Sequence, residues 1–400
     1  MSTTAPQQSP GTHLDRLDGF VPADAAGVVI VDLDALAGNW RALRDLVAPA
    51  ACAAVVKANG YGLGADRVIP ALCAAGADTF FVATLAEARQ ARALVADATA
   101  TVYVLDGVLP GSGQALHDAG AIPVISSLPE AKEWAALAPS RNEPMACAFH
   151  VDSGLNRLGL SAREIRALAS DMHTMDRVQV RLVMSHLACA DDPGHEKNTQ
   201  QLDVFRTLQP LLPSAPLSIA ASDGLMLGPD YHLDLVRPGY ALYGGQALPG
   251  RITPVKPVVE AYARVLQIRE LAPGQSVGYS ASFVANRITR VAVIAAGYGD
   301  GLPRHLSAAT GQTAGHVAFG GRRAPIVGRV SMDLITVDIT DLEGHAPDRG
   351  DWAELIGQSI SLEDVGAACG TIGYEILTRL SPRFARVYLG GGDGTGTQGT

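Results

Sequence analysis

Short apolar runs alternate with helical patterns through the first 250 residues of the chain. Patterns such as those at residues 85–92 and 201–208 predict helices. Eight apolar runs between them have the length of buried strands and lie near residues 52–56, 80–83, 101–105, 121–125, 145–151, 180–186, 217–221 and 233–236. Strands that alternate with helices favour a parallel sheet, and eight such units close a (β/α)8 barrel of TIM type. The pattern therefore predicts an α/β fold with this barrel over residues 26–253.

Segments of different composition and pattern lie on both sides of the predicted barrel. Residues 1–25, rich in Thr, Gln, Pro and Ser, are expected to form a flexible tail. A strand at 28–33 then leads into a helix, and the residues expected to share one face of that helix are Leu36, Trp40, Leu43 and Leu46.

The chain changes character after residue 253. Alternating strand-like segments such as 291–294 and 334–339 are separated by glycine-rich turns, which predicts a mostly β second domain over residues 254–390. Residues 391–400, rich in Gly and Thr, are expected to be disordered.

Composition and charge favour a compact protein with small-molecule ligands. The chain is 48% hydrophobic and 18% charged, with a net charge of −9 and no basic run, which argues against nucleic acid or an anionic membrane as a partner. Five cysteines without a Cys-x-x-Cys pair fit reduced thiols. The sequence shows neither a secretory leader nor an apolar stretch long enough to span a bilayer, so a cytoplasmic location is expected.

The first predicted barrel strand ends on a lysine that a glycine-rich turn follows. Lys57 comes directly after the apolar run, and residues 58–64 lead into a helical pattern. An amine that burial desolvates has a depressed pKa and can condense with a carbonyl, as a pyridoxal phosphate cofactor requires. A solvated lysine at a strand end fits the same pattern, as does a loose dinucleotide fingerprint made by Gly60, Gly62 and Ala65.

Polar residues also stand at the carboxyl ends of later strands, where barrel active sites form. Arg157 lies in the turn after the fifth run, His186 closes the sixth, Ser222 the seventh, and Arg237 precedes a Pro-Gly turn at the eighth. A hydroxyl and a glycine turn after strands seven and eight suit a phosphate ester.

Each of these residues also has a structural interpretation. Ser222 before Asp223 fits a helix cap, and a lone His186 fits a buried core histidine. The two arginines fit ion pairs with carboxylates such as Asp152 or Asp234. The position of the whole set at strand ends favours the functional interpretation.

Residues 55–64 resemble the pyridoxal-lysine motif of the bacterial alanine racemases, which are pyridoxal phosphate-dependent enzymes of barrel fold type III. The resemblance covers nearly the whole chain and implies that Lys57 holds pyridoxal 5'-phosphate as an internal aldimine. It implies that Arg157 holds the substrate carboxylate or its surroundings, and that Arg237 faces the pyridine nitrogen. A guanidinium cannot give that nitrogen a proton, which favours reprotonation at Cα over transamination. The other implied cofactor contacts are His186 on the ring and Tyr61, Ser222, Gly239 and Tyr240 at the phosphate.

The second domain carries further motifs of the same family. Residues 277–282 resemble the motif of the second base, which would be Tyr279, although a half-buried strand tyrosine is the alternative. Residues 297–301 and 328–333 resemble motifs whose Tyr298, Met332 and Asp333 shape the substrate entrance or carboxylate pocket.

The resemblance implies a function and a partner. The chain would interconvert L-alanine and D-alanine reversibly with two bases, Lys57 and Tyr279, and supply D-alanine for peptidoglycan. It would form a homodimer with shared active sites, in which the tyrosine of one subunit completes the site around the lysine of the other. Serine remains open as a substrate.

Three positions depart from the family pattern. His150 stands where many members have a carbamylated lysine that orients the arginine here numbered Arg157. Leu63 replaces a histidine, and Pro382 falls near a phosphate-binding tyrosine of some members.

Other pyridoxal proteins resemble parts of the chain. A metal-assisted lyase would use ligands in residues 186–195, whose spacing fits no standard zinc pattern, and no metal is expected. Small pyridoxal-binding carriers share the lysine motif but lack a second domain, and related decarboxylases place a carboxylate where this chain has Arg237.

Overall fold

A computed structural model of the chain describes residues 21–95, 97–141, 143–246, 254–312, 315–342, 344, 346–391 and 397–399. These residues form two compact units. One unit is Ala35–Lys256, and the other joins the stretch that ends at Asp34 to the stretch that begins at Pro257. No helix among the described residues is long and apolar enough to cross a membrane.

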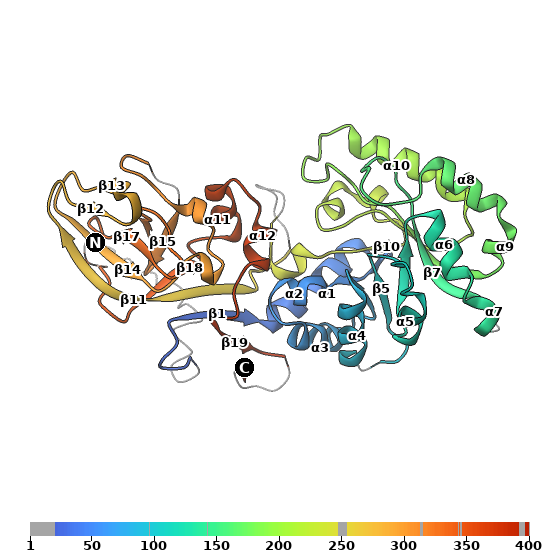
Figure 1. Ribbon diagram of the computed structural model, residues 1–400, viewed down its shortest axis with the longest axis horizontal. Coiled ribbons are helices and arrows are strands. Elements are labelled where there is room, and N and C mark those ends of the chain that lie inside the picture. The colour runs from blue at the N-terminus through green and yellow to red at the C-terminus, as the bar shows by residue number, and fades with distance from the viewer. Residues whose placement is uncertain are drawn as a thin grey trace, which may run out of the picture. The chain divides into compact units, whose positions relative to one another are not determined.

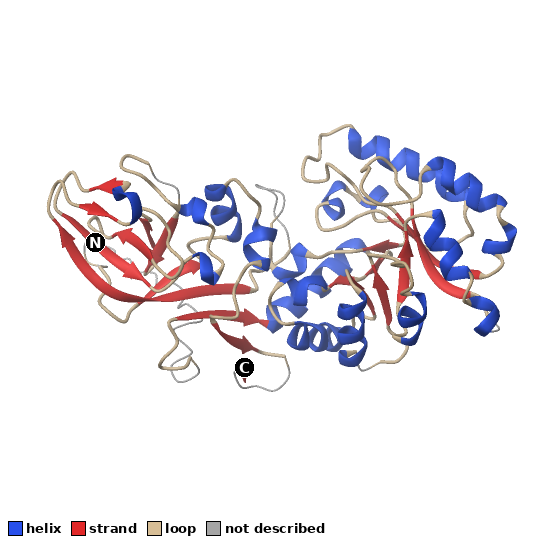
Figure 2. Ribbon diagram, viewed as in Figure 1, coloured by secondary structure: helices blue, strands red, loops and turns tan. Residues whose placement is uncertain are grey.

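The unit Ala35–Lys256 contains a ring of parallel strands, with helices around them in Figure 2. Its strands are β2 (Ala51–Cys52), β3 (Ala54–Val55), β4 (Thr79–Val82), β5 (Thr101–Val104), β6 (Ile122–Ile125), β7 (Met145–His150), β8 (Val178–Met184), β9 (Leu217–Ser218) and β10 (Leu235–Val236). Strands β3 to β9 pair in chain order, and β10 pairs in parallel with β2.

Backbone hydrogen bonds close this ring on both sides of β10. Asp234 N donates to Leu217 O at 3.1 Å, and Val55 N donates to Pro238 O at 3.0 Å. Strands β2 and β3 therefore act as one strand interrupted at Ala53, and the eight predicted runs make one closed (β/α)8 barrel.

Several helices belong to the barrel, and three of them begin at a capping Ser or Thr. The barrel helices are α1 (Leu33–Val47), α3 (Ala65–Ala75), α4 (Leu85–Leu94), α5 (Gly113–Asp118), α6 (Leu128–Ala135), α7 (Ala138–Arg141), α8 (Ala162–Ser170), α9 (Met172–Met175) and α10 (Lys197–Leu208). Thr84, Ser127 and Ser161 cap α4, α6 and α8 by accepting the N–H of a glutamate three residues later.

The apolar face of α1 differs from the predicted face at one position. Leu36, Trp40 and Leu43 are buried, but Leu46 is 45% exposed and Val47 is buried instead. The spacing of four from Leu43 to Val47 keeps the apolar residues on one side of a helix with 3.6 residues per turn.

The second unit is built on a mostly antiparallel sheet. Its strands follow the order β16-β15-β18-β11-β1-β19-β20, and β14 pairs with β11 and β17. Figure 1 shows β11 as the long strand to which several others pair. The elements are β1 (Gly27–Asp32), β11 (Val259–Leu271), β12 (Ser276–Val277), β13 (Phe283–Val284), β14 (Thr289–Ile294), β15 (His316–Phe319), β16 (Arg322–Pro325), β17 (Ile335–Asp338), β18 (Trp352–Ile356), α11 (Leu362–Cys369), α12 (Gly373–Thr378), β19 (Ala385–Leu389) and β20 (Thr397–Gly399).

Strand β1 was expected within the barrel range but pairs in this sheet. It is antiparallel to β11, with Val28 opposite Tyr262, and parallel to β19, with Val28 opposite Ala385. Val28–Val31 are buried on both faces, a pattern that suits either core. The local hydrophobic pattern therefore predicts the strand but not the strands with which it pairs.

The structure describes part of each predicted tail. The N-terminal tail lies outside the described residues as far as residue 20, while Val21 packs against the cluster of Val28, Ile30, Tyr262 and Val387. At the other end, Thr397–Gly399 form β20 and pair with β19, within the range that was expected to be disordered.

Candidate active site

The predicted barrel residues converge at the carboxyl ends of the strands. Lys57 follows β3, the turn with Arg157 follows β7, His186 follows β8 and Arg237 follows β10. Their charges act on one another: Arg157 and Lys57 lower the pKa of His186, and Arg237 lowers it most among the charged neighbours. The structure thus brings these residues into one electrostatically coupled group.

Lys57 begins a short left-handed turn, α2 (Lys57–Tyr61). Ala58, Asn59, Gly60 and Tyr61 have φ angles of 54°, 57°, 64° and 54°. Only Gly60 adopts this conformation without a steric cost, and each other residue costs roughly 1–2 kcal/mol. The side chain of Asn59 accepts the N–H of Ala65 at 2.9 Å at one end of the turn. At the other end Glu87 Oε1 accepts the N–H of Ala58 at 2.8 Å.

The surroundings of Lys57 favour its neutral amine. Burial lowers the pKa of Lys57 most, and the positive charge of Arg157 lowers it further. The carboxylates of Glu87 and Asp106 raise it and oppose this effect. A lowered pKa increases the fraction of neutral amine, which is the form that attacks a carbonyl.

Two histidines at this end of the barrel are held neutral. Burial lowers the pKa of His186 to about 3 and that of His150 to about 4, and Arg237 and Arg157 contribute to both shifts. His150 Nδ1 lies 3.4 Å from Ser126 Oγ in the interior. Neither histidine therefore adds a charge to the site near pH 7.

Arg237 is a buried cation whose partners are neutral. It is 3% exposed, its Nη2 donates to Ser185 O at 2.7 Å, and its Nη1 donates to Ser218 Oγ. Burial alone lowers its pKa, to about 9, so among the described residues no carboxylate compensates its charge. The predicted alternative, an ion pair with Asp234, is not what the structure shows, because Asp234 Oδ2 accepts the N–H of Leu217 instead.

Ser222 and the turn after β10 form a polar cradle. The N–H groups of Gly239 and Ala241 donate to Ser222 Oγ at 3.0 and 3.1 Å, so Ser222 does not simply cap its own turn. The two N–H groups stand at the start of the 3₁₀ helix Tyr240–Tyr243. A Cβ on Gly239 would lie 2.1 Å from Tyr61 Oη, so glycine is required there by the close approach of the tyrosine.

This cradle suits the phosphate of a cofactor. Tyr61 Oη, Ser222 Oγ and backbone N–H groups at the start of a helical turn are all hydrogen-bond donors for an anionic oxygen. Tyr61 is fixed by stacking on Tyr243, with ring centroids 4.6 Å apart. The surplus of positive charge from Arg157 and Arg237 also favours an anionic ligand.

Arg157 occupies an exposed turn beside these residues. Asp152 Oδ1 accepts the N–H groups of Gly154 and Asn156 at 2.9 and 3.1 Å and so shapes the turn that carries the arginine. Asn156 adopts a φ of 56°, which asparagine tolerates better than most residues. The Asp152 carboxylate thus binds backbone N–H groups of the turn.

The loop of residues 186–195 uses its polar groups to hold its own shape. Asp192 Oδ1 accepts the N–H of Gly194 at 3.1 Å, and His195 Nδ1 accepts the N–H of Lys197 at 3.1 Å. Among the residues that the structure describes, no group of three His, Cys, Asp or Glu side chains is arranged to hold a metal ion.

Tyr279 lies in the other unit, in a 3₁₀ turn (Tyr279–Ala281) that Gly278 separates from β12. Its side chain is 71% exposed, so it is not the half-buried strand tyrosine of the alternative interpretation. Gly278 precedes it with a φ of 74°, and Ser280 follows with a φ of 63°. This backbone projects a phenol from the surface of its unit.

The remaining motif residues of that unit meet through backbone hydrogen bonds. Tyr298 N donates to Ser331 O at 3.0 Å, and Gly299 N donates to Met332 O at 2.8 Å. Tyr298 and Met332 are 40% and 53% exposed, so the pair forms an open apolar surface.

Arg383 ties these two motifs together. Its Nη1 lies 2.9 Å from Asp333 Oδ1, and its Nε lies 3.2 Å from Asp300 Oδ1. Asp300 is buried and also accepts the N–H of Gly297. Asp333, predicted to bind substrate, therefore has an arginine partner within its own unit.

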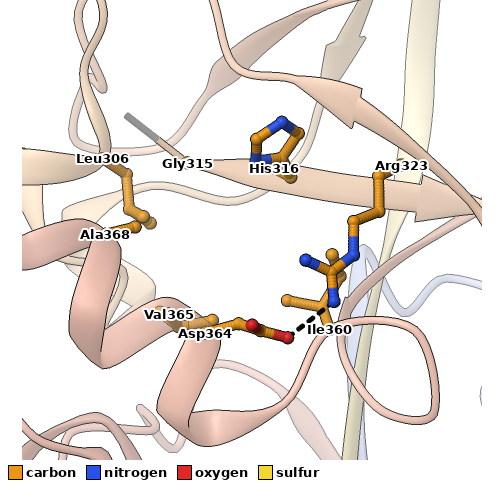
Figure 3. Close-up of a pocket in the computed structure, with 8 residues that line it drawn as sticks. All are labelled: Leu306, Gly315, His316, Arg323, Ile360, Asp364, Val365 and Ala368. Atoms are coloured by element: carbon orange, nitrogen blue, oxygen red, sulfur yellow. Dashed lines mark hydrogen bonds and ion pairs between the residues drawn. The ribbon is translucent and has the colours of Figure 1, made fainter. Parts of the chain in front are cut away.

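A pocket of the same unit is lined by none of these residues. It measures about 70 Å³ and lies between β15, β16 and α11, as Figure 3 shows. Arg323 pairs with Asp364 at 2.7 Å across it and donates to Ser359 O. Its volume is far below the roughly 300 Å³ of small ligand sites, and its arginine is already neutralised.

Sequence reasoning missed several residues that support the site. Glu87 holds the lysine turn, and Gln201, fully buried, accepts the N–H of Ala188 and donates to His186 O. The Thr84-x-x-Glu87 spacing signals a capping box, but the reach of the same glutamate to Ala58 has no local signature.

Comparisons with known proteins agree with this geometry. Residues 31–247 match the model of the alanine racemase N-terminal domain, and residues 258–388 match that of the alanine racemase C-terminal domain. The chain is 45% identical over 374 residues to an alanine racemase of Rhizobium meliloti (strain 1021), covering 92% of this chain and 98% of the relative. It is 45% identical over 370 residues to a catabolic alanine racemase of Mesorhizobium japonicum, covering 92% of this chain and 95% of that relative.

A solved structure extends the likeness to three dimensions. The crystal structure of alanine racemase from Bartonella henselae with covalently bound pyridoxal phosphate has a TM-score of 0.87 and 40% sequence identity. The match covers 91% of this chain and all of that one. Matches to both domain models, with relatives at 45% identity along almost their full length, show that this chain belongs to the alanine racemase family.

Proposed function

We propose that the chain is a pyridoxal phosphate-dependent alanine racemase that interconverts L-alanine and D-alanine. The observation that carries the proposal is the group at the barrel mouth, where Lys57, with a lowered pKa, lies in the field of Arg157. The same group includes Arg237, buried without a compensating carboxylate among the described residues. When bound, pyridoxal phosphate withdraws electrons from the substrate Cα and makes its proton acidic.

Different residues of the barrel bind different parts of this cofactor. Lys57 binds it covalently, and Ser222, Tyr61, Tyr240 and the N–H of Gly239 bind the phosphate. The phosphate site is supported by the two N–H groups that converge on Ser222 Oγ.

Two side chains would act on the pyridine ring of the cofactor. Arg237 would hold the ring nitrogen by donating a hydrogen bond without giving up a proton, since its pKa stays above neutrality at about 9. His186 would contact the ring as a neutral imidazole, since its pKa is lowered to about 3.

Two bases on opposite faces of Cα explain racemisation. Lys57 removes or returns the proton on one face, and Tyr279 does so on the other. Arg157 binds the substrate carboxylate, and Tyr298, Met332 and Asp333 line the approach. This role of the second unit is supported by the exposure of Tyr279, Tyr298 and Met332, which stand open on its surface.

The same exposure supports a homodimer with shared sites. A phenol that is 71% exposed on its own unit needs further surroundings to act as a positioned base. A second copy of the chain supplies them if the tyrosine of one subunit enters the site around the lysine of its partner.

The enzyme works in a reducing compartment such as the cytoplasm and supplies D-alanine for peptidoglycan. All five cysteines are free thiols, which supports the first statement. Growth of a D-alanine-requiring bacterium on this gene without added D-alanine tests the second.

The chemical test of the function uses the purified protein. Borohydride should fix the cofactor on Lys57, as located by peptide mass spectrometry, and either enantiomer of alanine should be converted to an equal mixture. A label on another lysine, or alanine that keeps its optical rotation, contradicts the proposal. Serine offered under the same conditions measures the breadth of the substrate range.

A further inference from the structure

The carboxylate of Glu87 joins two segments that are distant in the sequence. Its Oε1 accepts the N–H of Ala58 at 2.8 Å, and its Oε2 accepts the N–H of Ala83 at 2.7 Å and that of Thr84 at 3.3 Å. Ala83 follows β4, whereas Ala58 follows Lys57 in the left-handed turn. The side chain therefore connects the end of β4 to the peptide group just after the lysine.

Glu130 makes an equivalent connection farther along the barrel and provides a reference. Its Oε2 accepts the N–H groups of Ser126 and Val108 at 3.3 Å each, and its Oε1 accepts the hydroxyl of Ser127 at 2.8 Å. Val108 lies beyond β5, as Ala58 lies beyond β3. A glutamate that caps a helix and reaches back to the previous strand end is thus part of the scaffold, and only at Glu87 does it meet the lysine turn.

Within the turn the carbonyl oxygen of Ala58 accepts the N–H of Gly62 at 2.7 Å, while the N–H of Ala58 is held by Glu87. Ala58 has a φ of 54° and an apolar side chain, and the turn is exposed at Ala58 and Asn59. The Asn59 side chain secures the far end through Ala65. An ionised carboxylate that accepts a backbone N–H makes a stronger bond than a neutral acceptor does.

Glu87 also acts on Lys57 through its charge. It is the leading influence that raises the pKa of Lys57, against burial and Arg157, which lower it. Loss of the carboxylate removes this opposition and favours the neutral amine.

We propose that Glu87 is a positioning residue for Lys57, which fixes the peptide that follows the lysine and balances the positive charge around its amine. The proposal rests on the role of Lys57 given above. It assigns no contact between Glu87 and substrate or cofactor.

The test compares Glu87→Gln with Glu130→Gln in the full-length chain. Each change removes one charge from an equivalent capping glutamate and keeps an amide oxygen that accepts a hydrogen bond. After hydroxylamine has removed the cofactor, the rate at which acetic anhydride labels Lys57 is followed against pH by mass spectrometry. Activity of the holoenzyme is measured in parallel as separate kcat and KM values.

The expected results separate positioning from general stability. Glu87→Gln should move the midpoint of Lys57 labelling to lower pH, by on the order of one pH unit, while Glu130→Gln leaves it in place. The kcat of Glu87→Gln should fall on the order of tenfold to a hundredfold, because a small displacement of the amine is costly to the reaction. Glu87→Asp, which keeps the charge on a shorter side chain, should recover part of the shift in midpoint.

A labelling midpoint for Glu87→Gln that coincides with that of the parent overturns the inference, whatever happens to kcat or to thermal stability. If borohydride fixes the cofactor of the parent enzyme on a residue other than Lys57, the proposed function fails instead. With the label on Lys57 and an unshifted midpoint, only the inference about Glu87 fails.

Discussion

The buried histidines at the barrel mouth make the stability of the protein depend on pH. His150 is 6% exposed, and burial, aided by Arg237 and Arg157, lowers its pKa to about 4. The value in an unfolded chain is roughly 6.5. Between these two values the unfolded chain binds more protons at this residue, so the free energy of unfolding decreases as the pH falls through the window.

Replacing His150 by glutamine should remove this dependence. The parent loses roughly 3 kcal/mol of unfolding free energy at this residue between pH 6.5 and pH 4, and His150→Gln does not. Urea unfolding at a series of pH values measures the difference, and the two curves should run parallel above pH 7. A parallel course below pH 6 as well would show that His150 is not held neutral in the folded protein.

The same residue sets a second expectation, which depends on the family resemblance. Where many members carry a carbamylated lysine, an imidazole beside Ser126 forms no carbamate. Racemisation in buffer freed of carbon dioxide should therefore equal that with added bicarbonate, and His150→Lys should at best be neutral. Activity that drops in the first buffer and returns in the second would contradict this.

At the scale of an element, two glycines with opposite surroundings test the cradle after β10. A Cβ on Gly239 would collide with Tyr61 Oη, whereas a Cβ on Gly38, exposed within α1, meets nothing within 4 Å. Gly239→Ala should therefore weaken pyridoxal phosphate binding at least on the order of tenfold, by displacing Tyr61 from the phosphate donors.

Gly38→Ala is the matched control for that change. Alanine favours a helix interior over glycine by roughly 0.5–1 kcal/mol, so this variant should unfold at slightly higher urea concentration with unchanged cofactor affinity. Cofactor titration followed by absorbance, beside urea unfolding, measures both effects. Equal cofactor affinity in the two variants would show that Gly239 is not required by the approach of Tyr61.

The elements of the barrel were predictable from the sequence, and the shape of its lysine turn was not. Buried parallel strands produce apolar runs that local periodicity detects, and all eight were placed. The left-handed turn at Ala58 and Asn59 has no such signature, because alanine usually avoids that conformation and the carboxylate that holds its N–H comes from Glu87, 29 residues later. Strand β1 was detected, but its partners β11 and β19 lie at the other end of the chain, where no local pattern points.

At the scale of the whole molecule, the proposed shared site predicts complementation between two inactive variants. Lys57→Ala and Tyr279→Phe should each be inactive or nearly so. In a mixed dimer one site carries both changes and the other carries neither, so an equal mixture should regain roughly a quarter of the parental activity. Subunit exchange is verified by native mass spectrometry. A mixture that stays inactive after exchange would place the lysine and the tyrosine of each site in one chain.

The division of the chain predicts which fragments fold. In the sheet order, β1 separates β11 from β19, so residues 257–400 alone lack a strand in the middle of their sheet. That fragment should be largely unfolded by circular dichroism and should gain structure when a peptide of residues 21–34 is added. A shuffled peptide of the same composition is the control, and a fragment that folds without either peptide would contradict the prediction.

The position of β1 also determines the order in which a ribosome can finish this protein. Residues 27–32 leave the exit tunnel before the barrel does, whereas their partners in β11 and β19 are translated only after the complete barrel. At about 5–20 residues per second, the strand waits roughly 10–50 s for β11 and roughly 20–70 s for β19, with its apolar side chains and unpaired backbone exposed. We therefore expect a chaperone to bind the nascent chain at this segment. The barrel should fold before the sheet that contains β1 is complete.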